Sequence, residues 1–396
     1  MTSSDDTSTR IAEVLARPRR EAADSFVLHA PLEGLSRLAL LERILPSARE
    51  AVRERLDSLV ERYSAVPALP PEPHEEGIHD EPPERLAQSL ARAFSNGDVD
   101  EAGRLARRLA DTASPAELVA HVAESLLPRT GAAAHGAILL AELLRPGANA
   151  RAFAHAFVGL AREVAREPAA RIRWHERGTP QSGSVEALVE ALRRVPHVGD
   201  PGTDFIAPTV RLAEESGAAS AALGGCVGGV DPYEARRALA RVAALSMLED
   251  DAAKAPYIWT HTLTIPWAML SLVSHGARPE TSVATASTLA FAFRAVHART
   301  TLAREGTPHE PCSRSLEEAL VAAPHEAAAF VFHHPARGFE AVVAELLGRA
   351  ASHADAHVAK YALVSDDAAA DDPAFERHHR AALAHLLGVW AHASPA

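Results

Sequence analysis

Apolar residues recur at helical spacing along almost the whole chain, and this periodicity limits the fold more than any other feature of the sequence. One long amphipathic pattern covers residues 38–60 and is broken near Pro46. Another helix is expected at residues 118–126, with Ser114 as its N-cap and Pro115 as its first residue. Ala, Leu, Arg and Glu dominate, and these are strong helix formers. Since no alternating run bounded by turn pairs occurs, the sequence predicts an all-α protein.

The breaks between the expected helices are short. The proline- and acid-rich stretch 67–84 predicts an exposed connection, and further loops are expected near 176–184, 196–208, 304–315 and 365–373. None of them is long enough for an interdomain linker, and no repeat of fixed period is present. We therefore expect a flexible N-terminal tail over residues 1–20, followed by a single large helical domain over residues 21–394.

Charge and hydropathy exclude several classes of partner. The 396 residues carry a formal net charge of −12, which argues against a broad nucleic-acid-binding face. The most apolar stretch, residues 257–273, contains Pro266 and several hydroxyl residues and is a poor membrane span. The polar N-terminus does not resemble a secretory signal, and Cys226 and Cys312 form no disulfide framework. We expect a soluble cytoplasmic protein that binds neither nucleic acid nor membrane. The sequence does not indicate its oligomeric state.

Several common catalytic motifs are absent. The glycine-rich segment 224–229 has no preceding strand and no GK[ST] ending, so we interpret it as a loop and not as a phosphate-binding site. The chain contains no HExxH of zinc proteases and no GxSxG of hydrolases. The two matched Glu-x-x-His helices of ferritin-like di-iron proteins are also missing.

Lysine is rare in this chain, and one lysine lies beside two histidines. Of 40 basic residues only Lys254 and Lys360 are lysines. A buried lysine can lose its proton, whereas arginine in practice cannot. Lys254 lies next to acidic residues, and we assign it no role. Lys360 follows His353 and His357 at helical spacing, which predicts one stripe on a single helix. The stripe could be a surface face lined with histidine, or a metal site if CO2 carboxylates the lysine to an anionic oxygen ligand.

Three further histidines lie in apolar surroundings. His29, His135 and His261 belong to separate segments of the chain, which holds 21 histidines in all. Each one alone is more often a hydrogen-bonded core residue than a ligand. Three of them on different helices favour a metal site, because helical bundles build such sites from inward side chains. By contrast, His378, His385 and His392 lie seven residues apart, about 10 Å along a helix axis, which is too far for one metal.

Four segments of the chain resemble the questin-oxidase-like family, whose members are helical oxygenases. The resemblance covers about residues 25–392, although residues 171–230 match nothing in it, and Leu28 replaces an asparagine that the family carries. The Asp-x-His-Val-x-Lys segment is the most specific. The four segments are His29-Ala30-Pro31-Leu32, His135-Gly136-Ala137-Ile138, Thr260-His261-Thr262-Leu263-Thr264 and Asp355-Ala356-His357-Val358-Ala359-Lys360.

The resemblance implies a buried mononuclear metal site between helices. Some members of the family bind iron through four histidines and a carboxylated lysine, and these ligands suit Fe(II). Lys360 and His357 would then be catalytic residues, and one coordination position would stay open for O2 or substrate. We expect Asp355 to orient a ligand histidine and His353 to be the reserve ligand. The implied metal ligands are His29, His135, His261, His357 and carboxylated Lys360. The expected pocket walls flank His261 and are Trp259, Thr264 and Trp267.

The implied activity is an oxygenase of secondary metabolism. It would carry out oxidative C–C cleavage or Baeyer–Villiger-type oxygen insertion on a polycyclic aromatic, quinone-like or other small molecule. Its cofactors would be Fe(II), O2 as co-substrate, CO2 for the carboxylation of Lys360, and possible NADPH. Two alternatives stay open. One is an oxidoreductase without iron that uses NADPH or a flavin, although no Rossmann fingerprint is present. The other is a non-enzymatic helical ligand-binding scaffold.

Overall fold

The computed structural model describes residues 24–66, 81–145, 150–176, 181–203, 205–250, 252–303, 306–311 and 313–392. Within these ranges the chain forms eighteen α-helices and five short 3-10 helices. The same ranges contain two isolated β-bridges and no strand. The all-α prediction is therefore confirmed. The tail predicted over residues 1–20 and most of the connection predicted over residues 67–84 lie outside the described residues.

The helices follow one another through short connections. In chain order they are α2 (Ser25–Leu40), α3 (Arg49–Ser64), α4 (Pro83–Asn96), α5 (Val99–Thr112), α6 (Pro115–Leu126), α7 (His135–Leu143), α8 (Ala150–Ala165), α9 (Val185–Arg193), α10 (Ile206–Glu215), α11 (Ala218–Leu223), α12 (Pro232–Glu249), α13 (Pro256–Ser271), α14 (Pro279–His297), α15 (Leu316–Ala322), α16 (Pro324–His333), α17 (Phe339–Ser352), α18 (Ala356–Asp371) and α19 (Glu376–His392).

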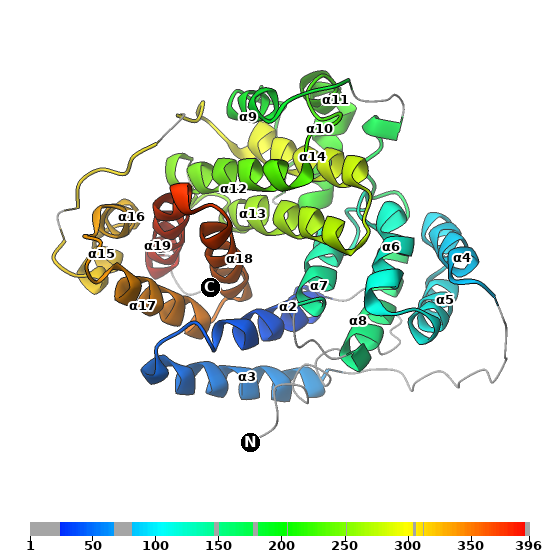
Figure 1. The fold of residues 1–396 in the computed structure, drawn as a ribbon, viewed down its shortest axis with the longest axis horizontal. Helices are drawn as coiled ribbons and strands as arrows, with labels where there is room; N and C mark the ends of the chain where they lie inside the picture. The colour runs from blue at the N-terminus through cyan, green and yellow to red at the C-terminus, as the bar shows by residue number, and fades with distance from the viewer. Residues whose placement is uncertain are drawn as a thin grey trace.

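Three long helices, α12, α13 and α14, pack side by side at the centre of the molecule (Figure 1). The helices α9, α10 and α11 lie along one side of this layer, while α15 to α19 and α4 to α8 lie toward its two ends. Helix α13 also packs against α18 and α7, and α2 packs against α3, α7 and α18. Three helices from distant parts of the sequence, α2, α7 and α18, therefore gather beside α13 of the central layer.

Local sequence signals explain how several helices begin. Ser114 accepts a hydrogen bond from the backbone N–H of Glu117, whose carboxylate accepts one from Ser114 in return, and Pro115 is the first helical residue. This capping box confirms the start predicted for α6. Asp24 and Asp355 cap α2 and α18 in the same way through backbone N–H groups of the first turn.

A proline inside α2 connects this helix to α3. Pro31 has no N–H, so the carbonyl of Val27, four residues earlier, has no partner within the helix. The Tyr63 hydroxyl on α3 donates its hydrogen to that carbonyl. The interruption caused by Pro31 is thus satisfied by a neighbouring helix, and α2 stays continuous through the segment that carries His29.

One prediction about the junction of α17 and α18 is wrong. Helix α17 ends at Ser352 and α18 begins at Ala356, so His353 does not share a helix with His357 and Lys360. The reason is local, because Asp355 caps a new helix at this point. Of the two alternatives for the stripe, the surface face is excluded for His357 and Lys360, since both side chains are buried.

The loop predicted over residues 365–373 is instead largely helical, because α18 continues to Asp371. The acidic residues that suggested a loop are paired with arginines from distant parts of the chain: Asp366 with Arg43 and Arg380, and Asp367 with Arg43 and Arg145. The remaining loops are non-helical over most of their described residues, although α10 already begins at Ile206. The glycine-rich segment 224–229 is a loop after α11, as predicted. No described helix is long and apolar enough to cross a membrane.

Candidate metal centre

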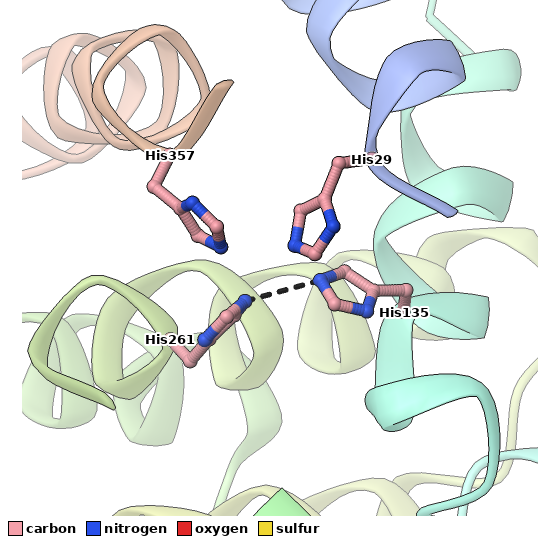
Figure 2. A group of neighbouring side chains, drawn as sticks. All are labelled: His29, His135, His261 and His357. Atoms are coloured by element: carbon pink, nitrogen blue, oxygen red, sulfur yellow. Dashed lines mark hydrogen bonds between the residues drawn. The ribbon is translucent and has the colours of Figure 1, made fainter. Parts of the chain in front are cut away.

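Four imidazoles from four different helices meet at one point. His29 comes from α2, His135 is the first residue of α7, His261 lies on α13 and His357 on α18. Their potential ligand nitrogens all lie within 4.8 Å of one another. Figure 2 shows the four rings pointing toward a common centre. Three of the four rings are buried and His29 is half-buried, so the centre is shielded from solvent.

The hydrogen bonds of these rings fix which nitrogen faces the centre. In three rings Nδ1 lies next to an oxygen that can only accept a hydrogen bond. These pairs are His29 with the Ser25 carbonyl at 2.6 Å, His135 with the Ala132 carbonyl at 3.1 Å, and His357 with the Asp355 carboxylate at 2.9 Å. The hydrogen of each neutral ring is therefore on Nδ1, and the lone pair on Nε2 is directed to the centre.

Two observations are compatible with a cation between these nitrogens. Nε2 of His135 lies 3.1 Å from Nε2 of His261, close to the roughly 3.0 Å that separates adjacent nitrogen ligands of a metal at about 2.1 Å. Nε2 of His29 is buried and has no hydrogen-bond partner among the described residues. A buried nitrogen left without a partner costs about 1–3 kcal/mol. A metal that accepts the lone pair removes this cost.

Lys360 lies directly beside this cluster. Its side chain is buried, with 2% of the residue exposed, and Nζ is 3.4 Å from Nε2 of His135. Burial lowers the pKa of Lys360 to about 7, an effect that the negative charges of Asp355 and Glu33 partly oppose. A substantial fraction of Lys360 is therefore a neutral amine near neutral pH, and a neutral amine is a nucleophile.

The imidazoles stay neutral for the same reason. Burial, and after it the charge of Lys360, lowers the pKa of His135, His261 and His357 well below the usual range. The same two causes lower the pKa of His29 to about 3. Because a histidine must be neutral to bind a metal, this environment holds all four rings in the ligand form at neutral pH.

An unusual backbone turn leads into His135. Ala132, Ala133 and Ala134 all have φ between 51° and 54°, in the left-handed region that non-glycine residues rarely adopt. The turn places the carbonyl of Ala132 against Nδ1 of His135. Glu167 supports the turn from outside by accepting a hydrogen bond from the N–H of Ala132 at 3.1 Å. The strained backbone thus orients this ring.

The other residues singled out in the sequence fall in different places. Asp355 accepts from Nδ1 of His357 and so holds the orientation of that ring. His353 is outside the cluster, because its Nδ1 accepts from the N–H of Asp355 at 3.0 Å and its ring packs against Trp390. The reserve role given to His353 therefore has no support in the geometry.

The three expected pocket residues are all buried on α13. The Thr264 hydroxyl donates to the Thr260 carbonyl of its own helix at 3.1 Å. Trp267 packs against the Arg236 guanidinium, 4.6 Å from the ring centroid. The Trp259 indole N–H has no partner among the described residues. These contacts place Trp267 against α12, and whether any of the three contacts a substrate stays a prediction.

Sequence reasoning missed four residues around the centre. The Tyr257 ring lies 4.6 Å from that of His357, and burial, and after it the nearby charge of Asp355, raises the pKa of its hydroxyl. Arg37 and Arg55 donate to backbone carbonyls of the turn between α17 and α18, and Glu33 accepts hydrogen bonds from both arginines. Glu33 and Arg37 gave a signal, since two opposite charges stand four residues apart directly after His29. Tyr257 and Arg55 gave none.

Comparison with known proteins adds no further information. Neither a family description, nor a curated protein, nor a solved structure matches the chain. The resemblance to questin-oxidase-like proteins thus stays a prediction, and the case for function depends on the geometry of the site.

Proposed function

We propose that this protein is a cytoplasmic non-heme iron oxygenase with one metal bound between α2, α7, α13 and α18. The observation that carries the proposal is the convergence of four imidazoles, three of them buried and one half-buried, with a buried lysine of lowered pKa. Three of the rings hydrogen-bond to the protein through Nδ1 and direct Nε2 to one point.

The residues of the centre would have different roles in binding the metal. His29, His135, His261 and His357 would hold the metal, and Lys360 would complete the ligand set as a carbamate. The neutral amine would attack CO2, so that an N–C bond forms, the nitrogen loses one proton and the side chain becomes an anion. An anionic oxygen beside four imidazoles suits Fe(II). Asp355 would hold the His357 ring, and the buried surroundings would exclude water from the reacting atoms.

The metal would supply the activation of O2. The resemblance suggests a small polycyclic aromatic or quinone-like substrate, which would undergo oxidative C–C cleavage or Baeyer–Villiger-type oxygen insertion, with NADPH as a possible reductant. The proposed reaction requires the open coordination position that five protein ligands leave at a six-coordinate metal. The net charge of −12 supports a small-molecule substrate over nucleic acid.

The first experiment measures metal content by mass spectrometry in protein purified without oxygen. The wild type is expected to hold about one iron per chain, and Lys360→Met and His261→Ala are expected to lose it while their circular dichroism stays helical. Lys254→Met is the matched control, because it removes the only other lysine, which is exposed on the surface. Carbon-13 NMR under labelled CO2 should show a carbamate in the wild type and in Lys254→Met alone.

Two outcomes would contradict the proposal. Wild-type protein that is free of iron and does not bind added Fe(II) would return the histidines to a structural role. Iron retained at full stoichiometry in both site variants would place the metal elsewhere. A flavin spectrum in the purified protein would instead favour the oxidoreductase without iron.

A further inference from the structure

A group of charged residues connects α2, which carries His29, with the turn before α18, which carries His357. We define the clamp as Glu33 and Arg37 of α2 together with Arg55 of α3. One oxygen of Glu33 accepts hydrogen bonds from both arginines, at 2.6 and 3.0 Å from Arg37 and 3.0 Å from Arg55. Glu33 and Arg37 are 4% and 0% exposed, so this is an interior ion pair and not a surface one.

Both arginines use their remaining N–H groups on a single short turn. This turn connects α17 to α18, and three of its carbonyls are bound. Arg37 donates to the carbonyls of Ala351 and His353, the second at 2.6 Å, and Arg55 donates to that of Ala354 at 2.6 Å. The Ala351 carbonyl belongs to the last turn of α17, where carbonyls have no partner within the helix, and His353 and Ala354 follow that end. The clamp thus satisfies these acceptors and fixes the turn against α2 and α3.

The turn leads directly to a metal ligand. Asp355 follows Ala354, caps α18 by accepting from the backbone N–H of His357 at 2.7 Å, and accepts from the Nδ1 of the same residue at 2.9 Å. On the other side of the clamp, Glu33 stands one helical turn after His29 on the same face of α2. Each end of the clamp is therefore adjacent to a different ligand helix.

We propose that Glu33, Arg37 and Arg55 are positioning residues of the metal centre, which hold His357 at ligand distance from His29. The inference rests on the proposed metal-binding function. The clamp does not touch the centre. It acts through the backbone of residues 351–354 and through Asp355, and without it α18 is held against α2 by the direct packing of the two helices alone. Loss of the clamp therefore reduces the affinity for metal beyond its effect on folding.

A merely structural ion pair would also destabilise the protein when broken, so the test needs a matched control. The chain offers one in Arg294 and Asp250, an ion pair at 2.6 Å whose side chains are 0% exposed. Arg294 likewise donates to a backbone carbonyl, that of Leu192. This pair lies between α14 and the end of α12, and neither residue belongs to the metal centre or contacts the turn.

The experiment titrates Co(II) and Fe(II) into the metal-free wild type and into Arg37→Met, Arg55→Met and Arg294→Met, and follows urea unfolding of each. Co(II) is useful because its visible absorption reports coordination geometry. Both clamp variants are expected to bind about 10–100-fold more weakly, the range found for residues that support metal ligands, with an altered Co(II) spectrum. Arg294→Met is expected to unfold at lower urea but to keep the wild-type affinity and spectrum.

Arg55→Met keeps the test decisive if Arg37→Met fails to fold, because the Arg55 side chain is 22% exposed and its loss is better tolerated. Clamp variants that bind Co(II) with wild-type affinity and spectrum would overturn the inference alone. A wild type that binds neither metal would overturn the proposed function, and the inference with it. Equal loss of affinity in Arg294→Met would show that the effect is general destabilisation and not positioning.

Discussion

At the scale of single residues, Asp355 combines two tasks in one carboxylate. The same oxygen, Oδ1, accepts from the backbone N–H of His357 and from the Nδ1 of its ring. The first contact begins α18 and the second fixes the tautomer of a candidate ligand. The Tyr257 ring also lies beside this pair, 4.6 Å from the ring of His357. The Asp355 side chain therefore both starts α18 and sets the tautomer and orientation of the His357 ring.

Two substitutions of Asp355 test the contribution of its carboxylate to the centre. Asp355→Ala removes the cap and the acceptor for Nδ1, so metal affinity is expected to fall by about 10–100-fold. Asp355→Asn keeps an oxygen that can cap the helix and removes only the negative charge, so its loss of affinity should be smaller. Titration of Co(II) against a competing chelator measures both values. Identical affinities in the wild type and the two variants would show that Asp355 only caps α18.

Part of the centre could be predicted from the sequence, and the rest could not, for physical reasons. His29, His135, His261 and His357 are recognisable because each is a polar group in an apolar helical segment. Tyr257 and Arg55 leave no comparable trace. They contact residues distant in the chain, Asp355 and a backbone carbonyl at Ala354, and such contacts impose no pattern on the neighbouring sequence.

At the scale of helices and turns, the most unusual element is the left-handed turn that precedes α7. Three consecutive alanines have positive φ, and an L-residue there pays about 1–2 kcal/mol of steric strain. Glycine has no Cβ and adopts this region without strain. The chain nevertheless has alanine at all three positions directly before a candidate metal ligand. Strain of this kind at a functional site indicates that surrounding contacts, such as the one with Glu167, hold the turn in place.

This turn gives a prediction of unusual sign. Ala133→Gly is expected to raise the free energy of unfolding by about 1 kcal/mol, because relief of strain outweighs the added freedom of the unfolded chain. The control is Ala120→Gly in the interior of α6, where the alanine is exposed and helical and the same change should cost about 1 kcal/mol. Urea unfolding measures both. Destabilisation by Ala133→Gly of the same size as in the control would contradict the left-handed conformation.

Helix ends could be predicted where the signal is local. The start of α6 follows from Ser114, Pro115 and Glu117, which form the whole capping box within four residues. The continuation of α18 through Asp366 and Asp367 could not be predicted, because those carboxylates are neutralised by arginines of α19 and of the segments after α2 and α7. A run of acidic residues suggests an exposed loop because the sequence does not reveal the distant arginines that pair with them in the folded protein.

At the scale of the whole molecule, burial of neutral bases makes the stability of the metal-free protein depend on pH. Burial lowers the pKa of His379 to about 3 and that of His385 to about 4, as it does for His29 in the metal centre. Each unfolded histidine takes up a proton near pH 6.5, while the folded one does not until lower pH. The unfolded state thus binds more protons between pH 6.5 and about 3, and stability falls as the pH decreases through this window.

Lys360 extends the same effect to alkaline pH. Its pKa is about 7 in the folded protein against 10.5 when exposed, so the unfolded state again binds the extra proton between these values. The buried histidines are therefore expected to make the free energy of unfolding of metal-free protein rise with pH from about 3 to 6.5. Lys360 is expected to make it rise again from pH 7 to 10.5. Lys360→Met should flatten the alkaline part alone, and urea unfolding at a series of pH values measures it.

His379 provides the clearest test of the acid branch, because neither of its ring nitrogens has a hydrogen-bond partner among the described residues and it lies outside the metal centre. His379→Leu removes two unsatisfied polar atoms and one titrating group. We expect it to raise the free energy of unfolding by about 1–3 kcal/mol at pH 8. The gain should be larger at pH 5, because each buried neutral histidine adds about 1.4 kcal/mol per pH unit to the slope of the free energy of unfolding against pH.

The control is His392→Leu, at the exposed end of the same helix, which should leave that slope unchanged. If His379→Leu instead shows the same dependence on pH as the wild type, a buried neutral imidazole at this position is ruled out, and the acid sensitivity must come from the remaining histidines.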